Sequence, residues 1–200
     1  MGVKLVSSSG GSVEINPPVT ASNFTATMPA GTGNVVVNGV NGALVSGTAV
    51  ASTSGTSIDF TGIPSWVRRI TVLFQGVSTN GSSVPQIRLG SGSFATSGYS
   101  GTSSVVTSGA ATSNASVGFP VAPTGFWGSS TTISGSFSVS LQNSSTNTWC
   151  GNGIYGGIDT ASTYFSAGSV ALSGTLDRVR ITTVNGTDTF DAGSINILYE

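Results

Sequence analysis

The chain has 200 residues, six of them basic and seven acidic, and its formal net charge is -1. Charged residues make up 6% of the chain, against about 25% in an ordinary domain. Six cations are too few to neutralise a run of nucleic-acid phosphates or to hold a polybasic patch on a membrane surface, so neither partner is expected. The combination of high net charge and low hydrophobicity that marks disordered chains is also missing.

Small polar residues replace the missing charge. The chain contains 35 Ser, 26 Thr, 29 Gly and 12 Asn, which together make up about half of it. These residues favour strands and turns and are poor helix formers. The composition therefore predicts a nearly all-β protein.

The sequence offers little catalytic or metal-binding chemistry. It has no histidine, which removes Ser-His-Asp and Cys-His catalysis and histidine-ligated metal sites. Cys150 is the single cysteine, so neither an intrachain disulfide nor a multi-cysteine zinc site is available. We predict no catalytic residue, no metal site and no cofactor, and therefore no enzyme.

The compartment follows from two features of the chain. Residues 1–12 lack the apolar stretch of about 7–15 residues that a signal peptide needs, and the chain is poor in cysteine. The longest strongly apolar run, residues 70–74, is far shorter than the ~20 residues of a membrane span. We expect synthesis in a reducing cytoplasm and no membrane insertion.

The chain is expected to divide near residue 50. Residues 1–50 hold short candidate strands, and residues 46–57 are almost all small and polar and are typical of a linker. Residues 51–200 contain the longer strands and all three tryptophans, so the main core is expected there. The candidate strands of the first region are residues 3–6, 12–15, 24–28 and 34–37.

Alternation of apolar and polar residues dominates the second region. Ile70, Val72 and Phe74 alternate with more polar neighbours, as expected of strands with one face on a core. Several such strands in one chain predict an antiparallel β-sandwich, jelly-roll-like in type. The same alternation occurs at residues 133–141, 178–182 and 195–200.

Two loop regions are also predicted. Asn185-Gly186 lies between alternating segments and favours a two-residue hairpin that would pair Ile181 with Phe190. Residues 97–118 carry few apolar side chains and favour a long surface excursion, with poorly paired strands as the alternative.

The first region is too small and too poor in large apolar side chains to be stable alone. We therefore expect residues 1–50 to be a β-rich attachment and oligomerisation region that packs on the rest of the chain, on other copies or on a larger assembly.

Five side chains are candidates for binding. Trp127, Phe126 and Tyr155 lie beside turn residues, and exposed aromatic rings stack on sugar faces; the alternative is that each is a core or interface anchor. Arg68 and Arg69 are candidates for a polar or anion contact; the alternative is an ion pair with Asp59 or Asp177, or a hydrogen bond between subunits.

Several segments resemble bacteriophage proteins. Residues 55–72 (GTSIDFTGIPSWVRRITV) resemble a run that recurs in virion appendage proteins of tailed phages, and so do residues 172–180 and 182–200. Residues 4–8 and 20–25 are similar to segments that precede such domains. Together these segments cover a little under half of the chain.

The resemblance implies a non-enzymatic structural protein of the virion, a homotrimeric tail fibre or spike component with a β-sandwich head. Its partners would be copies of itself and other virion proteins of the tail, neck or capsid. The candidate aromatic contacts add a host cell-surface glycan as a further expected partner. The chain has no long fibre shaft, which keeps open a capsid decoration (cement) protein or a head fibre. A glycan-binding module acting as a receptor-binding protein, or a depolymerase, is a further alternative.

Overall fold

A computed structural model describes residues 3–6, 9–10, 12–15, 44–107, 110–159 and 161–200. Contacts divide the chain into two units, Met1–Val35 and Val36–Glu200, and each is described by itself. In the first unit, β1 (Val3–Val6) pairs antiparallel with β2 (Ser12–Ile15). These are the bounds predicted for the first two strands. The predicted strands at residues 24–28 and 34–37 lie outside the described residues.

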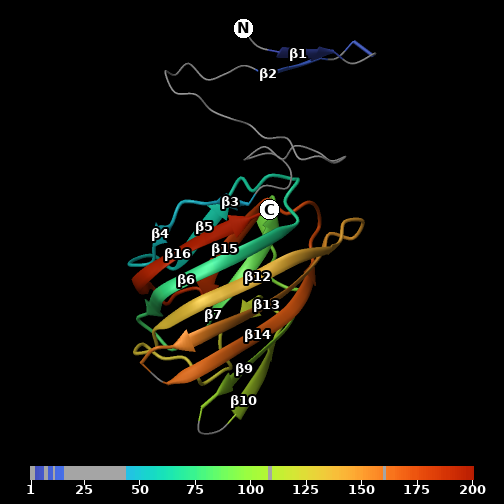
Figure 1. Ribbon diagram of the computed structural model, residues 1–200. Coiled ribbons are helices and arrows are strands. Elements are labelled where there is room, and N and C mark those ends of the chain that lie inside the picture. The colour runs from blue at the N-terminus through green and yellow to red at the C-terminus, as the bar shows by residue number, and fades with distance from the viewer. Residues whose placement is uncertain (1–2, 7–8, 11, 16–43, 108–109, 160) are drawn as a thin grey trace, which may run out of the picture. The chain divides into compact units, whose positions relative to one another are not determined.

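The second unit is an antiparallel β-sandwich, as predicted, and its described residues contain no helix (Figure 1). The large sheet has the order β10 (Ala110–Ala115), β9 (Ser100–Val106), β14 (Ser162–Ala171), β13 (Thr148–Gly157), β12 (Ile133–Asn143), β6 (Arg69–Thr79), β16 (Phe190–Tyr199) and β3 (Val45–Ser46), and β4 (Val50–Ala51) also pairs with β16. The small sheet has the order β11 (Phe119–Pro120), β7 (Pro85–Ser91), β15 (Arg178–Thr183) and β5 (Ser57–Thr61), and β8 (Ser93–Phe94) also pairs with β7.

The core lies between the inner faces of the two sheets. On β6, Ile70, Val72 and Phe74 are buried while the residues between them are more exposed, which confirms the predicted alternation. Phe137 of the large sheet packs on Phe119 of the small sheet with ring centroids 4.9 Å apart. Aromatic rings of this size bury much of the apolar area that stabilises a sandwich.

The first and last strands of the sandwich pair with each other in both layers. β5 pairs with β15 in the small sheet, where Ile58 lies opposite Ile181. β6 pairs with β16 in the large sheet, where Val72 lies opposite Ile197. The chain therefore crosses between the layers both early and late, from β5 to β6 and from β15 to β16.

The hairpin predicted at Asn185-Gly186 is wrong. Ile181 lies opposite Ile58 and Ile87 in the small sheet, whereas Phe190 lies opposite Thr79 in the large sheet. The connection between them is a turn in which the Asn185 side-chain oxygen accepts hydrogen bonds from the backbone N–H groups of residues 187 and 188. An Asx turn of this kind reverses the chain without pairing the flanking strands.

Residues 46–57 are not a free linker. β3 and β4 add to the edge of β16, and the Ser52 hydroxyl, fully buried, donates to the Ala192 carbonyl at 2.7 Å. Edge pairing uses backbone groups, so small polar residues suffice for it. The boundary expected between residues 50 and 51 falls inside β4.

Residues 97–118 are also paired rather than a surface excursion. β9 pairs with β14 on one side and with β10 on the other. Val105 of β9 is fully buried and anchors the pair to the core. Few apolar residues are needed here because only one face of these strands meets the core.

The fold predicts unequal tolerance to alanine at two glycines with positive φ. At Gly193 (φ 87°), a Cβ would overlap the carbonyl oxygens of Gln75 and Gly76, whereas at Gly186 (φ 69°) it would meet nothing within 4 Å. Gly186→Ala should cost about 1–2 kcal/mol in the free energy of unfolding, from the left-handed conformation alone. Gly193→Ala should cost clearly more, as measured by urea unfolding. Equal shifts would contradict the tight approach of β6 to β16.

Candidate functional site

Two of the three predicted aromatic contact residues are core residues. The Trp127 side chain, in the segment between β11 and β12, is only 5% exposed, and its indole N–H donates to the Thr79 hydroxyl at 2.8 Å. Tyr155 on β13 is fully buried and packs edge-on against Phe74. Burial raises the pKa of the Tyr155 hydroxyl. A glycan contact by Trp127 or Tyr155 is therefore wrong for this structure, and only Phe126, 40% exposed, is accessible.

The glycines around Tyr155 explain why the sequence was misleading there. Gly151 and Gly153 resemble loop residues, but both lie within strand β13. A Cβ on Gly151 would come within 2.7 Å of the Phe137 ring, and one on Gly153 within 2.8 Å. These glycines make room for a large ring on the neighbouring strand, a use of glycine within strands that is general in proteins.

The two predicted arginines have different partners from those expected. Arg68 donates to the Ser65 carbonyl at 2.9 Å and to the Val67 carbonyl at 3.0 Å. Arg69, at the start of β6, forms an ion pair with Glu200. Asp59 and Asp177, the partners proposed for these arginines, bind Arg180 and Arg178 instead.

A cluster of charged side chains lies on the outer face of the small sheet. Asp59, Arg180 and Arg88 lie directly opposite one another on β5, β15 and β7. Arg180 donates two hydrogen bonds to Asp59, at 2.7 and 2.6 Å, and its guanidinium lies 4.1 Å from the centre of the Phe94 ring. This geometry fixes Arg180, and its bond to Asp59 raises the Arg180 pKa. Burial lowers the pKa of Arg88, whose Nε donates to the Val117 carbonyl.

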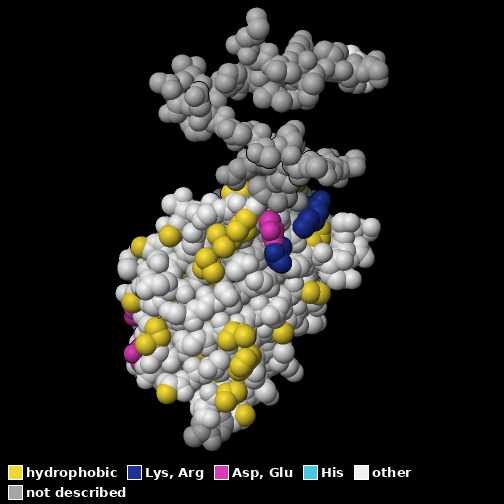
Figure 2. All heavy atoms as spheres, viewed as in Figure 1, with side chains coloured by type: hydrophobic (Ala, Val, Ile, Leu, Met, Phe, Trp, Pro, Cys, Tyr) yellow, Lys and Arg dark blue, Asp and Glu magenta, His cyan; other side chains and the backbone are white. Residues whose placement is uncertain are grey.

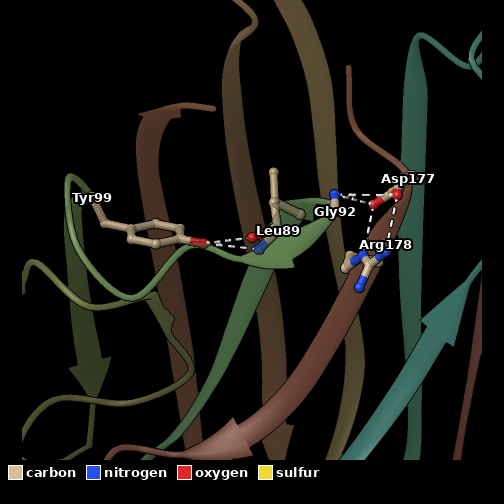
Figure 3. A network of polar contacts seen from close by, with 5 residues as sticks. All are labelled: Leu89, Gly92, Tyr99, Asp177 and Arg178. Atoms are coloured by element: carbon tan, nitrogen blue, oxygen red, sulfur yellow. Dashed lines mark hydrogen bonds and ion pairs between the residues drawn. The ribbon is translucent and has the colours of Figure 1, made fainter. Parts of the chain in front are cut away.

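Asp177 and Tyr99 hold the edge of β7. Asp177 accepts hydrogen bonds from Arg178 and from the Gly92 N–H, and these bonds, above all that from Arg178, lower its pKa (Figure 3). The Tyr99 hydroxyl accepts from the Leu89 N–H at 2.8 Å and donates to the Leu89 carbonyl, and burial raises its pKa to about 12. Both contacts satisfy backbone groups of β7 or its turn, so both side chains have structural roles.

The outer face of the large sheet has a different chemistry. A row across five strands of this face consists of Ser104, Phe165, Ile154, Ser136 and Leu73, each opposite the next. Figure 2 shows hydrophobic side chains gathered over β13 and β14, and a second group over β6 and β16 near the charged side chains of this face. The patch over β13 and β14 was not among the predicted contact residues. The sequence signal for it was the alternation of the strands. Ile154 and Phe165 directly adjoin the buried Tyr155 and Tyr164 in the chain, so they lie on the opposite face of the sheet.

A shallow groove of about 370 Å³ lies in this face, over β9, β13 and β14. Its lining includes Ile154 and Phe165, which are 54% and 39% exposed, together with the side chains of Asn152, Thr112 and Ser104. None of the described residues that line it is charged. Such a site can bind an uncharged ligand through an aromatic surface and a few hydrogen bonds.

The carboxylates of the described residues are largely engaged in the fold. Asp59, Asp177 and Glu200 are in ion pairs, and Asp188 accepts from the Ser83 N–H and the Asn185 side chain. Among the residues that the structure describes, no group of three or more His, Cys, Asp or Glu side chains is placed to hold a metal ion. The same residues include no helix that is long and apolar enough to cross a membrane.

No protein-family model, no curated protein and no solved structure matches the chain.

The assignment of Trp127 to the core can be tested with its neighbour as control. Trp127→Ala should lower the free energy of unfolding by about 3–5 kcal/mol, because it removes a large buried ring. Phe126→Ala should cost less than about 2 kcal/mol, because this ring is partly exposed. Urea unfolding of both variants measures the difference. Similar small losses would contradict the burial of Trp127.

The lowered pKa of Asp177 predicts a dependence of stability on pH. Because this pKa lies below its value of about 4 in the unfolded chain, Asp177 stabilises the folded state above that pH and loses this effect as the pH falls below it. Since the side chain is 39% exposed, the effect should be at most about 1 kcal/mol.

The measurement is urea unfolding of Asp177→Asn at neutral and acid pH. This variant should lose less stability on acidification than the wild type does, and the exposed control Asp159→Asn should lose as much as the wild type. An unchanged loss in Asp177→Asn would show that the ion pair with Arg178 has no energetic weight.

Proposed function

We propose that the protein is a non-enzymatic structural component of a bacteriophage particle, a homotrimeric tail fibre or spike protein whose β-sandwich is the head. Residues 1–50 would be the attachment and oligomerisation region. The partners would be copies of the chain and other proteins of the tail, neck or capsid. The protein would be made in the bacterial cytoplasm and reside in the virion.

One observation carries this proposal: the segments that resemble phage appendage proteins pair with one another. Residues 55–72 contain β5 and the start of β6, and residues 172–200 contain β15 and β16. β5 pairs with β15 and β6 with β16, although more than 100 residues separate the members of each pair. A resemblance that arose by chance would have no reason to fall on strands that together form one end of a two-layer sandwich.

Further contacts join the same two segments. The Phe190 N–H donates to the Gly55 carbonyl at 2.9 Å, and the Thr182 hydroxyl donates to the Thr56 carbonyl at 2.8 Å. The ion pairs Arg180–Asp59 and Arg69–Glu200 also connect them. Residues 55–72 and 172–200 therefore form one physically contiguous unit, as segments of a shared domain would.

The surface chemistry supports an assembly role. The outer face of the large sheet combines hydroxyl side chains with exposed apolar ones, and a net charge near zero favours association over colloidal repulsion. Carboxylates held in ion pairs with arginines are poorly suited to the paired acid and base roles of a glycan depolymerase. Both points favour a structural role over an enzymatic one.

A capsid decoration protein or head fibre is the second candidate. At Val45 the chain already pairs with β16 of the sandwich. Residues 46–57 therefore supply no spacer before the sandwich, which favours a part without a shaft.

The homotrimer is tested by light scattering of the purified full chain. The expected mass is about three times the 19.8 kDa of one chain, and it should persist on dilution. A stable monomer at micromolar concentration would contradict the trimer. A dimer would do so equally.

A further inference from the structure

Two apolar side chains, Ile154 and Phe165, form the floor of the groove on the outer face of the large sheet. Ile154 of β13 lies directly opposite Phe165 of β14, so their side chains are neighbours on the same face. Both are substantially exposed although the core lies on the other side of the same strands. Apolar side chains placed together on the solvent face of a sheet add nothing to the core, and side by side they offer an apolar surface to a ligand.

The floor is bordered by hydrogen-bonding groups that the fold leaves free. The Asn152 amide and the Thr112 and Ser104 hydroxyls form no hydrogen bond with other described residues, although all three line the groove. An amide supplies both a donor and an acceptor, and a hydroxyl supplies either. Asn152 lies on the strand that bears Ile154, two residues away and therefore on the same face, so polar and apolar contacts are offered together.

We propose that this groove binds a neutral carbohydrate chain. The apolar face of a sugar ring stacks on Phe165 and Ile154, while its hydroxyls exchange hydrogen bonds with Asn152, Thr112 and Ser104. The absence of charged lining residues complements an uncharged ligand and disfavours acidic sugars or phosphates, whose charge would lose solvation without gaining a partner. The inference depends on the groove and not on the virion role, and it replaces Trp127 and Tyr155 as the candidate glycan contacts.

A saccharide fits this surface better than a second copy of the chain does. The groove is hollow and bordered by free polar groups, whereas contacts between copies are flat or interdigitated with an apolar centre whose polar groups are paired across the interface. Contact between copies is nevertheless a defined outcome of the test below.

The test is calorimetric titration of the full chain with neutral hexasaccharides of glucose, galactose and N-acetylglucosamine, and with polygalacturonate as the acidic probe. At least one neutral hexasaccharide should bind saturably, and more tightly than polygalacturonate. Phe165→Ser should weaken that binding by about tenfold or more, because the stacking surface is lost. Asn152→Ala, a smaller change on an exposed side chain, should weaken that binding as well. This second variant keeps the test valid if Phe165→Ser does not fold.

Ile158→Ser is the matched control, since Ile158 is 62% exposed, against 54% for Ile154, but does not line the groove. Its affinity should equal that of the wild type. The proposal would be overturned by no saturable binding of any neutral hexasaccharide, by tighter binding of polygalacturonate, or by full affinity in both groove variants. A fall in the light-scattering mass of Phe165→Ser would also overturn it and would assign the patch to contacts between copies. None of these results bears on whether the protein is part of a virion.

Discussion

The pairing of the first strands of the sandwich with the last is the constraint on which the rest of the structure depends. β6 lies between β16 and β12, so its register with β16 sets the position of β12 and, through it, of β13, β14, β9 and β10. In the other layer, β15 lies between β5 and β7. These contacts join residues far apart in the chain. The pairing of these strands therefore carries most of the entropic cost of loop closure in the sandwich. The ion pairs Arg180–Asp59 and Arg69–Glu200 fall on these same strand pairs.

The scarcity of charge follows from how the two faces of each sheet are used. The inner faces hold aromatic and branched side chains, and large rings such as Phe137 are accommodated by glycines on the neighbouring strand. The described charges of the small sheet are concentrated in one cluster, where arginines meet carboxylates and the Phe94 ring. On the outer face of the large sheet, the ion pair Arg69–Glu200 lies at β6 and at the end of β16. Over β9, β13 and β14 this face carries hydroxyl, amide and apolar groups, and this is the chemistry of the groove.

The sequence predicted the elements better than their partners. Alternation located β6 because Ile70, Val72 and Phe74 report directly on which face is buried. It could not show that β15 and β16 belong to different layers, since the Asn185-Gly186 signal is local and sheet membership is not. Arginine partners were missed for the same reason: strand register decides that Arg180 meets Asp59. Tyr155 was misread because the glycines beside it serve the Phe137 ring on another strand.

A structural part of a virion must be present in the particle in a defined place. Electron microscopy of purified particles from the host that encodes the chain, labelled with an antibody against the β-sandwich, tests the proposed virion role most directly. We predict label at one fixed position, on the tail, neck or capsid, of intact particles. Label absent from particles, with the protein recovered only in the soluble fraction of the lysate, would contradict it.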